Sequence, residues 1–411
     1  MTAPKRALAV LFAVNCLNIY DRQALAALVE PLRREFGLSD TQVGALSTGF
    51  IVVYALGGLP MGRLADRGSR KRLLAAGLAV WTSLTAAGGM AAGYAALLAS
   101  RLGVAVGEAA CAPAATSWIG DAFPASQRAR AMGIFMLGVP LGVALSLAAS
   151  GAIAGAFGWR AALFAAALPA LVLLPLLLRL REPPRAAAKP EGSARGLLRL
   201  PVFRWIVVSG ALVNFNLYVI STFLPAYLTR FHGMSVARAG IWAGAGSGIA
   251  GAIAALGGGA WGDRAGAAHG RLRAAAFAAA AAAPAALAAI ALPAGEAPAS
   301  LTFMMIAYGL LNAYYALVYA AIQDLVEPRL RGTAMAVYLM AMYLCGAAFG
   351  PLLTGGLSDL LAGRAAALGP EAARAAGLRQ AMLVLPVLAA ALALVLAAAS
   401  RKCRPRLRAD R

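Results

Sequence analysis

The sequence is poor in charged residues, in cysteine and in histidine. Only 13% of its 411 residues are Asp, Glu, Lys or Arg, against about 25% in a typical soluble domain. The four cysteines and two histidines show neither the spacing of a disulfide framework nor that of a metal site. These shortages exclude a soluble enzyme, a disulfide-rich secreted domain and a disordered chain.

Apolar residues make up 61% of the sequence and gather into long runs. About 20 mostly apolar residues are enough for one helix to cross a hydrocarbon layer of about 30 Å. We therefore predict an all-α membrane protein with twelve transmembrane helices. The predicted runs are 8–29, 41–62, 74–93, 95–119, 130–154, 161–179, 205–229, 239–261, 273–292, 300–325, 332–357 and 377–399.

The net charge of +21 reflects where Lys and Arg stand between these runs. With the N-terminus placed in the cytoplasm, 27 of the 37 basic residues fall in cytoplasmic segments and 8 in outer loops, among them Arg33 and Arg230. Such a bias sets the orientation of a multi-pass protein. We predict an inner-membrane protein with both termini in the cytoplasm. The basic residues form no continuous face, so we expect no nucleic-acid partner.

One basic, proline-rich segment divides the runs into two sets of six. We predict an N-terminal six-helix half at 1–180, a cytoplasmic linker at 181–204 and a C-terminal six-helix half at 205–400. Residues 401–411 form a basic cytoplasmic tail.

The two halves repeat each other. The motif GRLADR (62–67) follows the second run, and GAWGDR (259–264) follows the eighth, 197 residues later. DAFPASQR (121–128) and DLVEPRLR (324–331) lie 203 residues apart. Duplicated halves are typical of secondary transporters, which bind substrate near the bilayer midplane between the halves.

The segment GLPMGRLADRGSRKR (58–72) resembles the loop signature of the major facilitator superfamily. NIYDR (18–22), RLGVAVGEA (101–109), APAAT (112–116) and GPLLTGGLSD (350–359) resemble the spinster family within it. The resemblance spans essentially the whole chain. It implies the major facilitator fold with two pseudo-symmetric halves, alternating access, and a substrate such as a lysophospholipid or sphingoid phosphate. Some of these stretches are shared with organic-anion symporters, which remain an alternative.

Four charged residues, Asp21, Arg22, Arg101 and Glu108, lie deep inside the predicted spans. Charge there is costly, and it is usually paired or functional. Asp21 lies about 20 Å into the first run, at about 1.5 Å per residue. Arg101 and Glu108 are seven residues apart and share one helix face. We predict an ion-pair network between the first and fourth helices that takes part in proton coupling; the alternative is a static pair that fixes helix packing.

The tenth run contains a row of neutral polar residues, namely Tyr308, Asn312, Tyr315, Tyr319 and Gln323. Their spacings of four, three, four and four residues place them on one helix face. The resemblance implies that the first and fourth helices line the cavity, and we expect the ligand between the first, fourth, seventh and tenth helices. The predicted cavity residues are Asn18, Asn214, Tyr218, Tyr308, Asn312, Tyr315, Tyr319 and Gln323. With two acids and two arginines beside them, this neutral site suits a zwitterionic or amphipathic ligand.

The repeated loop motifs suggest a conformational latch. Asp66 can accept hydrogen bonds from a helix N-terminus and from an arginine such as Arg128. The alternative for the basic run at 70–72 is anchoring of topology. The predicted gating residues are Gly62, Asp66, Arg67, Arg70, Arg128, Asp263 and Arg264.

No catalytic constellation stands out. His232 and His269 are predicted to lie in loops, and there is no phosphate-binding P-loop motif. We expect a monomeric secondary transporter, not an enzyme, with no metal or cofactor. Its partners are protons, the lipid bilayer and a small-molecule or lipid-like substrate. The alternatives are an organic-anion/proton symporter or a drug exporter and, in a different class, a polytopic membrane enzyme or a channel.

Overall fold

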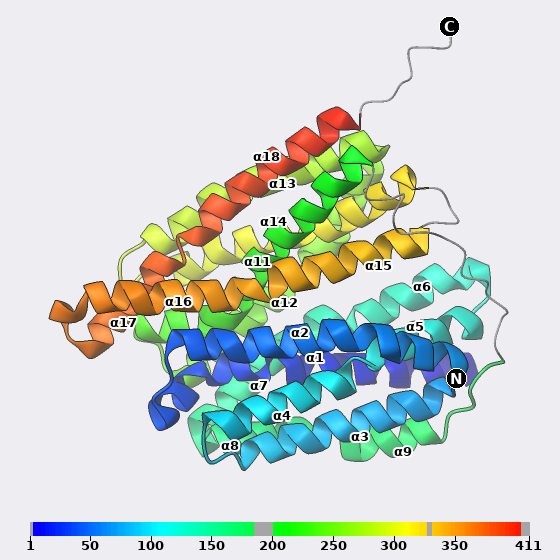
Figure 1. Ribbon diagram of the computed structural model, residues 1–411, viewed down its shortest axis with the longest axis horizontal. Coiled ribbons are helices and arrows are strands. Elements are labelled where there is room, and N and C mark those ends of the chain that lie inside the picture. The colour runs from blue at the N-terminus through cyan, green and yellow to red at the C-terminus, as the bar shows by residue number, and fades with distance from the viewer. Residues whose placement is uncertain (1–2, 185–199, 327–330, 404–411) are drawn as a thin grey trace, which may run out of the picture. The chain divides into compact units, whose positions relative to one another are not determined.

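The computed structural model describes residues 3–184, 200–326 and 331–403, and the regular elements in these ranges are helices (Figure 1). The structure does not describe the side chains of Asp66 and Arg128. Ten of the described segments are long and apolar enough to cross a membrane. The other two predicted runs, 8–29 and 74–93, fall on helices α1 and α3.

The chain forms two compact units. The first comprises Met1–Ala188 and Ser221–Gly248, and the second comprises Lys189–Ile220 and Ile249–Arg411. The division falls within two helices, α11 (Pro201–Arg230) and α12 (Val236–Ala265). The last part of α11 and the first part of α12 therefore belong to the first unit.

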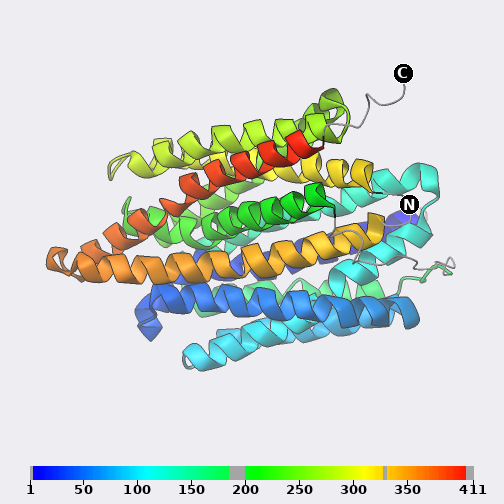
Figure 2. The same ribbon diagram turned by 45° about the horizontal axis from the view of Figure 1, so that its top comes forward.

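The remaining helices each lie within one unit. The first unit contains α1 (Ala3–Phe36), α2 (Asp40–Arg67), α3 (Arg70–Gly89), α4 (Tyr94–Glu108), α5 (Cys111–Ala122), α6 (Ala125–Met136), α7 (Gly138–Phe157), α8 (Trp159–Ala167) and α9 (Ala170–Leu178). The second contains α13 (Ala268–Ala291), α14 (Ala297–Leu325), α15 (Arg331–Ala341), a π-helical turn (Met342–Ala347), α16 (Phe349–Arg364), a short 3₁₀ turn (Ala366–Leu368), α17 (Pro370–Ala381) and α18 (Val384–Lys402). Within it, α13 packs against both α14 and α18 (Figures 1 and 2).

Several predicted runs consist of two helices in the structure, and proline explains where they divide. Proline has no backbone N–H and clashes with the carbonyl four residues earlier. The break between α4 and α5 begins at Ala109, four residues before Pro113. In the same way α6 ends at Met136, four residues before Pro140. The break after Glu108 places this residue at the end of α4, inside a predicted span.

Glycines allow α12 to approach α7 closely within the first unit. A Cβ atom on Gly240 would lie 2.5 Å from the Leu147 carbonyl oxygen, and one on Gly244 would lie 2.6 Å from the Ala144 carbonyl oxygen. Small residues at such crossings are typical of helices packed in lipid. No larger side chain fits at Gly240 without a backbone shift.

Candidate functional site

A buried charged cluster in the first unit joins α1 to α4. The Nε and Nη2 atoms of Arg22 both donate to Oε2 of Glu108 at 3.2 Å. Nη2 also lies 3.5 Å from Oδ1 of the predicted cavity residue Asn18. The Glu108 side chain is fully buried, and that of Arg22 is 8% exposed. The ion pair that the sequence predicts is therefore present.

Asp21 and Arg101 complete this Arg22 cluster. Arg101 is buried and donates from Nη2 to the Asp21 backbone carbonyl at 3.2 Å. The Asp21 carboxylate is fully buried, and neither of its oxygens has a hydrogen-bond partner among the described residues. The nearby indole N–H of Trp81 lies outside hydrogen-bond geometry. Glu108 Oε1 is also unpartnered there, so three carboxylate oxygens in the cluster are open.

Two aromatic rings on α2 cover the arginines. The Arg22 guanidinium lies 4.1 Å from the centre of the Tyr54 ring, and that of Arg101 lies 5.0 Å from the centre of Phe50. An arginine over a ring face is stabilised by the ring quadrupole. Asp21 and Arg22 stand out in the sequence because they are charged residues within an apolar run. Phe50 and Tyr54 are neutral and do not stand out in this way, so the sequence analysis missed both.

A second polar cluster lies in the second unit, between α11 and α14. The Tyr315 hydroxyl donates to Oδ1 of Asn214 at 3.0 Å. Tyr319 packs edge-on against Tyr315, with ring centroids 5.5 Å apart. Tyr218 packs edge-on against Tyr343 of the π-helical turn, with ring centroids 6.4 Å apart. The structure thus brings four predicted cavity residues into this tyrosine cluster.

The other predicted residues of α14 take different positions. Tyr308 is buried, and the Asn312 amide donates to the Tyr308 backbone carbonyl at 2.9 Å. Gln323 is half-buried near the end of the helix.

Buried hydroxyls behind the tyrosine cluster were missed in the sequence. Tyr314 shares a 2.7 Å hydrogen bond with Ser209, and the Tyr338 hydroxyl donates to that of Tyr314 at 2.9 Å. Consecutive tyrosines on a helix lie on different faces, so Tyr315 belongs to the predicted stripe and Tyr314 does not. The buried hydroxyls hold α11, α14 and α15 together behind the stripe.

Arg70 is the centre of a hydrogen-bonded hub at the start of α3. It is completely buried and binds Glu182 through Nε at 2.9 Å, and it also pairs with Asp121. Ser69 donates to the other Glu182 oxygen at 2.6 Å. Burial alone would raise the pKa of Glu182, but the donors from Ser69, Arg70 and Lys71 outweigh it and lower that pKa to about 2. The predicted gating residue Arg70 is thus tightly bound to α5 and to the 180–184 segment.

The repeated motif of the second unit contains a similar pair. Arg271, near the start of α13, pairs with Asp324 and donates to the Gly262 carbonyl at 3.2 Å. Asp324 is the repeat counterpart of Asp121. The predicted gating residues Asp263 and Arg264 are exposed and form no ion pair with the part of the chain that the structure describes.

The other predicted gating residues lie near the end of α2 and at the start of α6. Gly62 is half-buried with open space around it, and Arg67 is exposed. The predictions for the Asp66 and Arg128 side chains fall outside the described residues.

A second buried ion cluster, which the sequence did not indicate, joins three helix ends in the first unit. Arg230, at the end of α11, binds both Asp40 oxygens, with Nη1 and Nη2 at 2.7 and 2.8 Å. Arg230 also pairs with Glu30, whose other oxygen accepts from Arg33 at 3.1 Å. In this Arg230 cluster every carboxylate oxygen is bound. The charge count predicts loops for Arg33 and Arg230, but both lie in helices, and their side chains are only 3% and 2% exposed.

Comparison with known proteins agrees with this architecture. The sequence pattern of the Major Facilitator Superfamily matches residues 11–351. An MFS-type efflux pump of Mycolicibacterium smegmatis is 32% identical over 369 residues, which cover 87% of this chain and 86% of that protein. Human protein spinster homolog 1 is 30% identical over 238 residues, which cover 54% of this chain and 45% of that protein.

A solved structure extends the similarity to the whole fold. It is a bacterial homologue of the human lysosomal transporter spinster in an inward-facing, unoccupied conformation. The two chains superpose with a TM-score of 0.87 at 28% identity, over 98% of each. The family match covers most of the chain, and the chain resembles spinster homologues in both sequence and fold. This chain, a transporter and not an enzyme, belongs to the Major Facilitator Superfamily.

Proposed function

We propose that the chain is a monomeric, proton-coupled secondary transporter that works by alternating access. Its substrate is a small amphipathic or zwitterionic molecule of the lysophospholipid type. The ten apolar spans together with α1 and α3 support a count of twelve transmembrane helices, which we propose to form two six-helix halves. The distribution of Lys and Arg supports an inner-membrane location with both termini in the cytoplasm.

One contrast carries the proposal. The Arg230 cluster binds all four of its carboxylate oxygens, as expected of a static ion network. The Arg22 cluster leaves three carboxylate oxygens of Asp21 and Glu108 open. Buried polar groups are nearly always satisfied, so exceptions call for a functional explanation. The open oxygens are suited to take up a proton during the transport cycle.

Charge balance links that proton to an anionic group on the substrate. Asp21 and Glu108 balance Arg22 and Arg101, so the ionised cluster is neutral. When Glu108 is protonated, the cluster carries one excess positive charge, and the interaction between Glu108 and Arg22 is weaker. A phosphate or carboxylate group then restores neutrality by pairing with Arg22. Proton and anion therefore favour each other's binding, and this coupling is reciprocal.

The tyrosine cluster supports a zwitterionic substrate. The faces of Tyr218, Tyr315 and Tyr319 suit a quaternary ammonium group, which is attracted to aromatic rings. The Asn214 amide and the tyrosine hydroxyls offer neutral hydrogen bonds. The tyrosine cluster is therefore suited to the ammonium group of an amphipathic molecule.

Transport into proteoliposomes with an imposed pH gradient tests the proposal. We expect the gradient to drive movement of lysophosphatidylcholine and not of a hexuronate. Glu108→Gln removes the proton site and should abolish gradient-driven movement. Glu35→Gln is the control, because Glu35 pairs with Arg160 at the surface of the same unit. Movement of the hexuronate alone would instead establish an organic-anion symporter, and an absent response to the gradient would remove proton coupling.

Drug export is the second candidate. The identity to the mycobacterial efflux pump, which extends over 87% of this chain, favours it. The aromatic rings of the tyrosine cluster would also accept a lipophilic cation. Efflux of ethidium from proteoliposomes, with lysophosphatidylcholine as competitor, separates the two substrates.

A further inference from the structure

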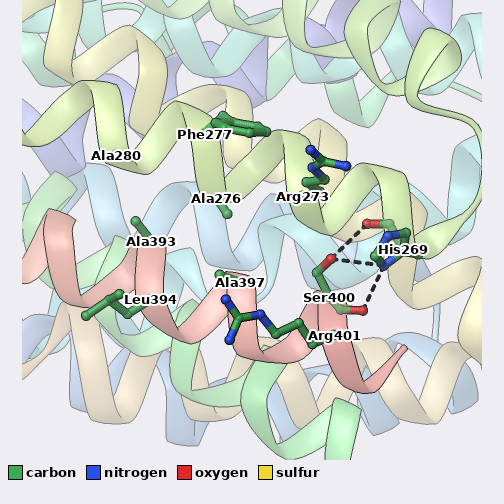
Figure 3. A pocket seen from close by; sticks show the side chains of 10 residues that line it. All are labelled: His269, Arg273, Ala276, Phe277, Ala280, Ala393, Leu394, Ala397, Ser400 and Arg401. Carbon is green, nitrogen blue, oxygen red and sulfur yellow. Dashed lines mark hydrogen bonds between the residues drawn. The ribbon is translucent and has the colours of Figure 1, made fainter. Parts of the chain in front are cut away.

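A groove lies between α13 and α18 in the second unit, where α13 begins and α18 ends (Figure 3). Its volume is about 430 Å³. Alanines from both helices line it, and their small side chains leave the space open; they are Ala276, Ala280, Ala393 and Ala397. A groove of this size is large enough for a ligand.

The two helix ends that form the groove are fastened together. His269 Nδ1 lies 2.8 Å from the Ser400 backbone carbonyl and 3.0 Å from the Ser400 hydroxyl (Figure 3). His269, predicted in a loop, is the second residue of α13. The groove is therefore part of a fixed helix pair.

The groove is apolar at one end and basic at the other. Phe277 and Leu394 are 58% and 74% exposed, and both belong to segments apolar enough to span a membrane. Arg273 on α13 and Arg401 on α18 are exposed at the ends of these segments (Figure 3). Neither pairs with a carboxylate of the described ranges, whereas Arg271, two residues before Arg273, pairs with Asp324.

We propose that this groove binds an anionic phospholipid of the surrounding bilayer. The phosphate pairs with Arg273 and Arg401, and an acyl chain lies along Phe277 and Leu394. Basic pockets between transmembrane helices bind anionic lipid headgroups in this manner. The occupant is a lipid and not a free anion because the charges and the apolar surface are continuous.

Equilibrium binding of fluorescent phosphatidylglycerol to the purified full chain in neutral detergent tests the site. The test variant is the double substitution Arg273→Gln and Arg401→Gln. The control is Arg364→Gln with Arg374→Gln, which removes the same charge from exposed positions on α16 and α17. Each arginine near an anionic lipid contributes about fivefold, so we expect binding to the test variant to weaken roughly 30-fold. The control should stay within about twofold of the wild type, because these positions lie outside the groove.

Three results would overturn the proposal. One is equal binding to both double variants. The second is binding of phosphatidylcholine as tight as that of phosphatidylglycerol. The third is displacement of the lipid by millimolar inorganic phosphate, which would make the site one for a soluble anion. Melting curves of both variants establish that the exposed substitutions leave the fold intact.

Discussion

Removal of Arg230 should weaken the first unit. Its guanidinium binds both Asp40 oxygens and pairs with Glu30, and all three side chains are only 2–4% exposed. Arg230→Gln removes both hydrogen bonds that the guanidinium donates to the buried Asp40 carboxylate. Glu30 keeps the second arginine of the cluster, Arg33. The main loss is therefore one bidentate, desolvated ion pair.

The size of the effect follows from burial. Removing one member of a buried ion pair costs about 3–5 kcal/mol, because the other charge stays uncompensated. The same substitution at Arg160 breaks an ion pair with Glu35, whose members are 42% and 40% exposed. An exposed pair contributes about 1 kcal/mol or less. We expect Arg230→Gln to lower the free energy of unfolding at least three times as much as Arg160→Gln.

Unfolding of the purified protein in mixed detergent micelles, followed by circular dichroism, measures this difference. The double variant Arg230→Gln with Asp40→Asn removes both charges and should regain part of the lost stability. Equal stability of Arg230→Gln and Arg160→Gln would refute the reasoning. The reasoning would also be refuted if the double variant Arg230→Gln with Asp40→Asn were about 3–5 kcal/mol less stable than Arg230→Gln alone.

Three further predictions concern other parts of the two units. The pKa of Glu182 is lowered to about 2 from its usual 4.5, so its ionised carboxylate stabilises the fold above pH 4.5, and this stabilisation is lost as the pH falls toward 2. The difference in melting temperature between the wild type and Glu182→Gln should therefore be largest above pH 4.5 and shrink below it. Gly240→Ala forces a Cβ against the Leu147 carbonyl and should lower the free energy of unfolding by about 1–3 kcal/mol. Gly257→Ala, whose Cβ meets open space in the same helix, should raise the free energy of unfolding by about 0.5–1 kcal/mol. Melting curves distinguish the two variants. Tyr315→Phe removes the hydrogen bond to Asn214 and should raise the transport KM about fivefold.

The Arg22 cluster could be found in the sequence because charge within an apolar run is rare and costly. Asp21, Arg22, Arg101 and Glu108 stand out for that reason alone. The hydroxyls and amides of α14 stand out because a helical period places them on one face. In both cases a local pattern carries the information.

The Arg230 cluster has no such local pattern. Its charges stand at the ends of apolar runs, where Lys, Arg, Asp and Glu are ordinary. Arg230 and Glu30 are 200 residues apart, so only the fold brings them together. The Arg70 hub has the same origin, because Glu182 reaches Arg70 across 112 residues. Contacts between the ends of distant helices cannot be read from periodicity.

The most direct test of the account is whether substrate binding takes up a proton at Glu108. Lysophosphatidylcholine is added to the purified protein in weakly buffered solution with a pH-sensitive dye. Because the proton and the phosphate group of the substrate are predicted to favour each other's binding, the wild type and Glu35→Gln should take up about one proton per chain, and Glu108→Gln none. Binding without proton uptake by the wild type, or equal uptake by Glu108→Gln, would contradict the account.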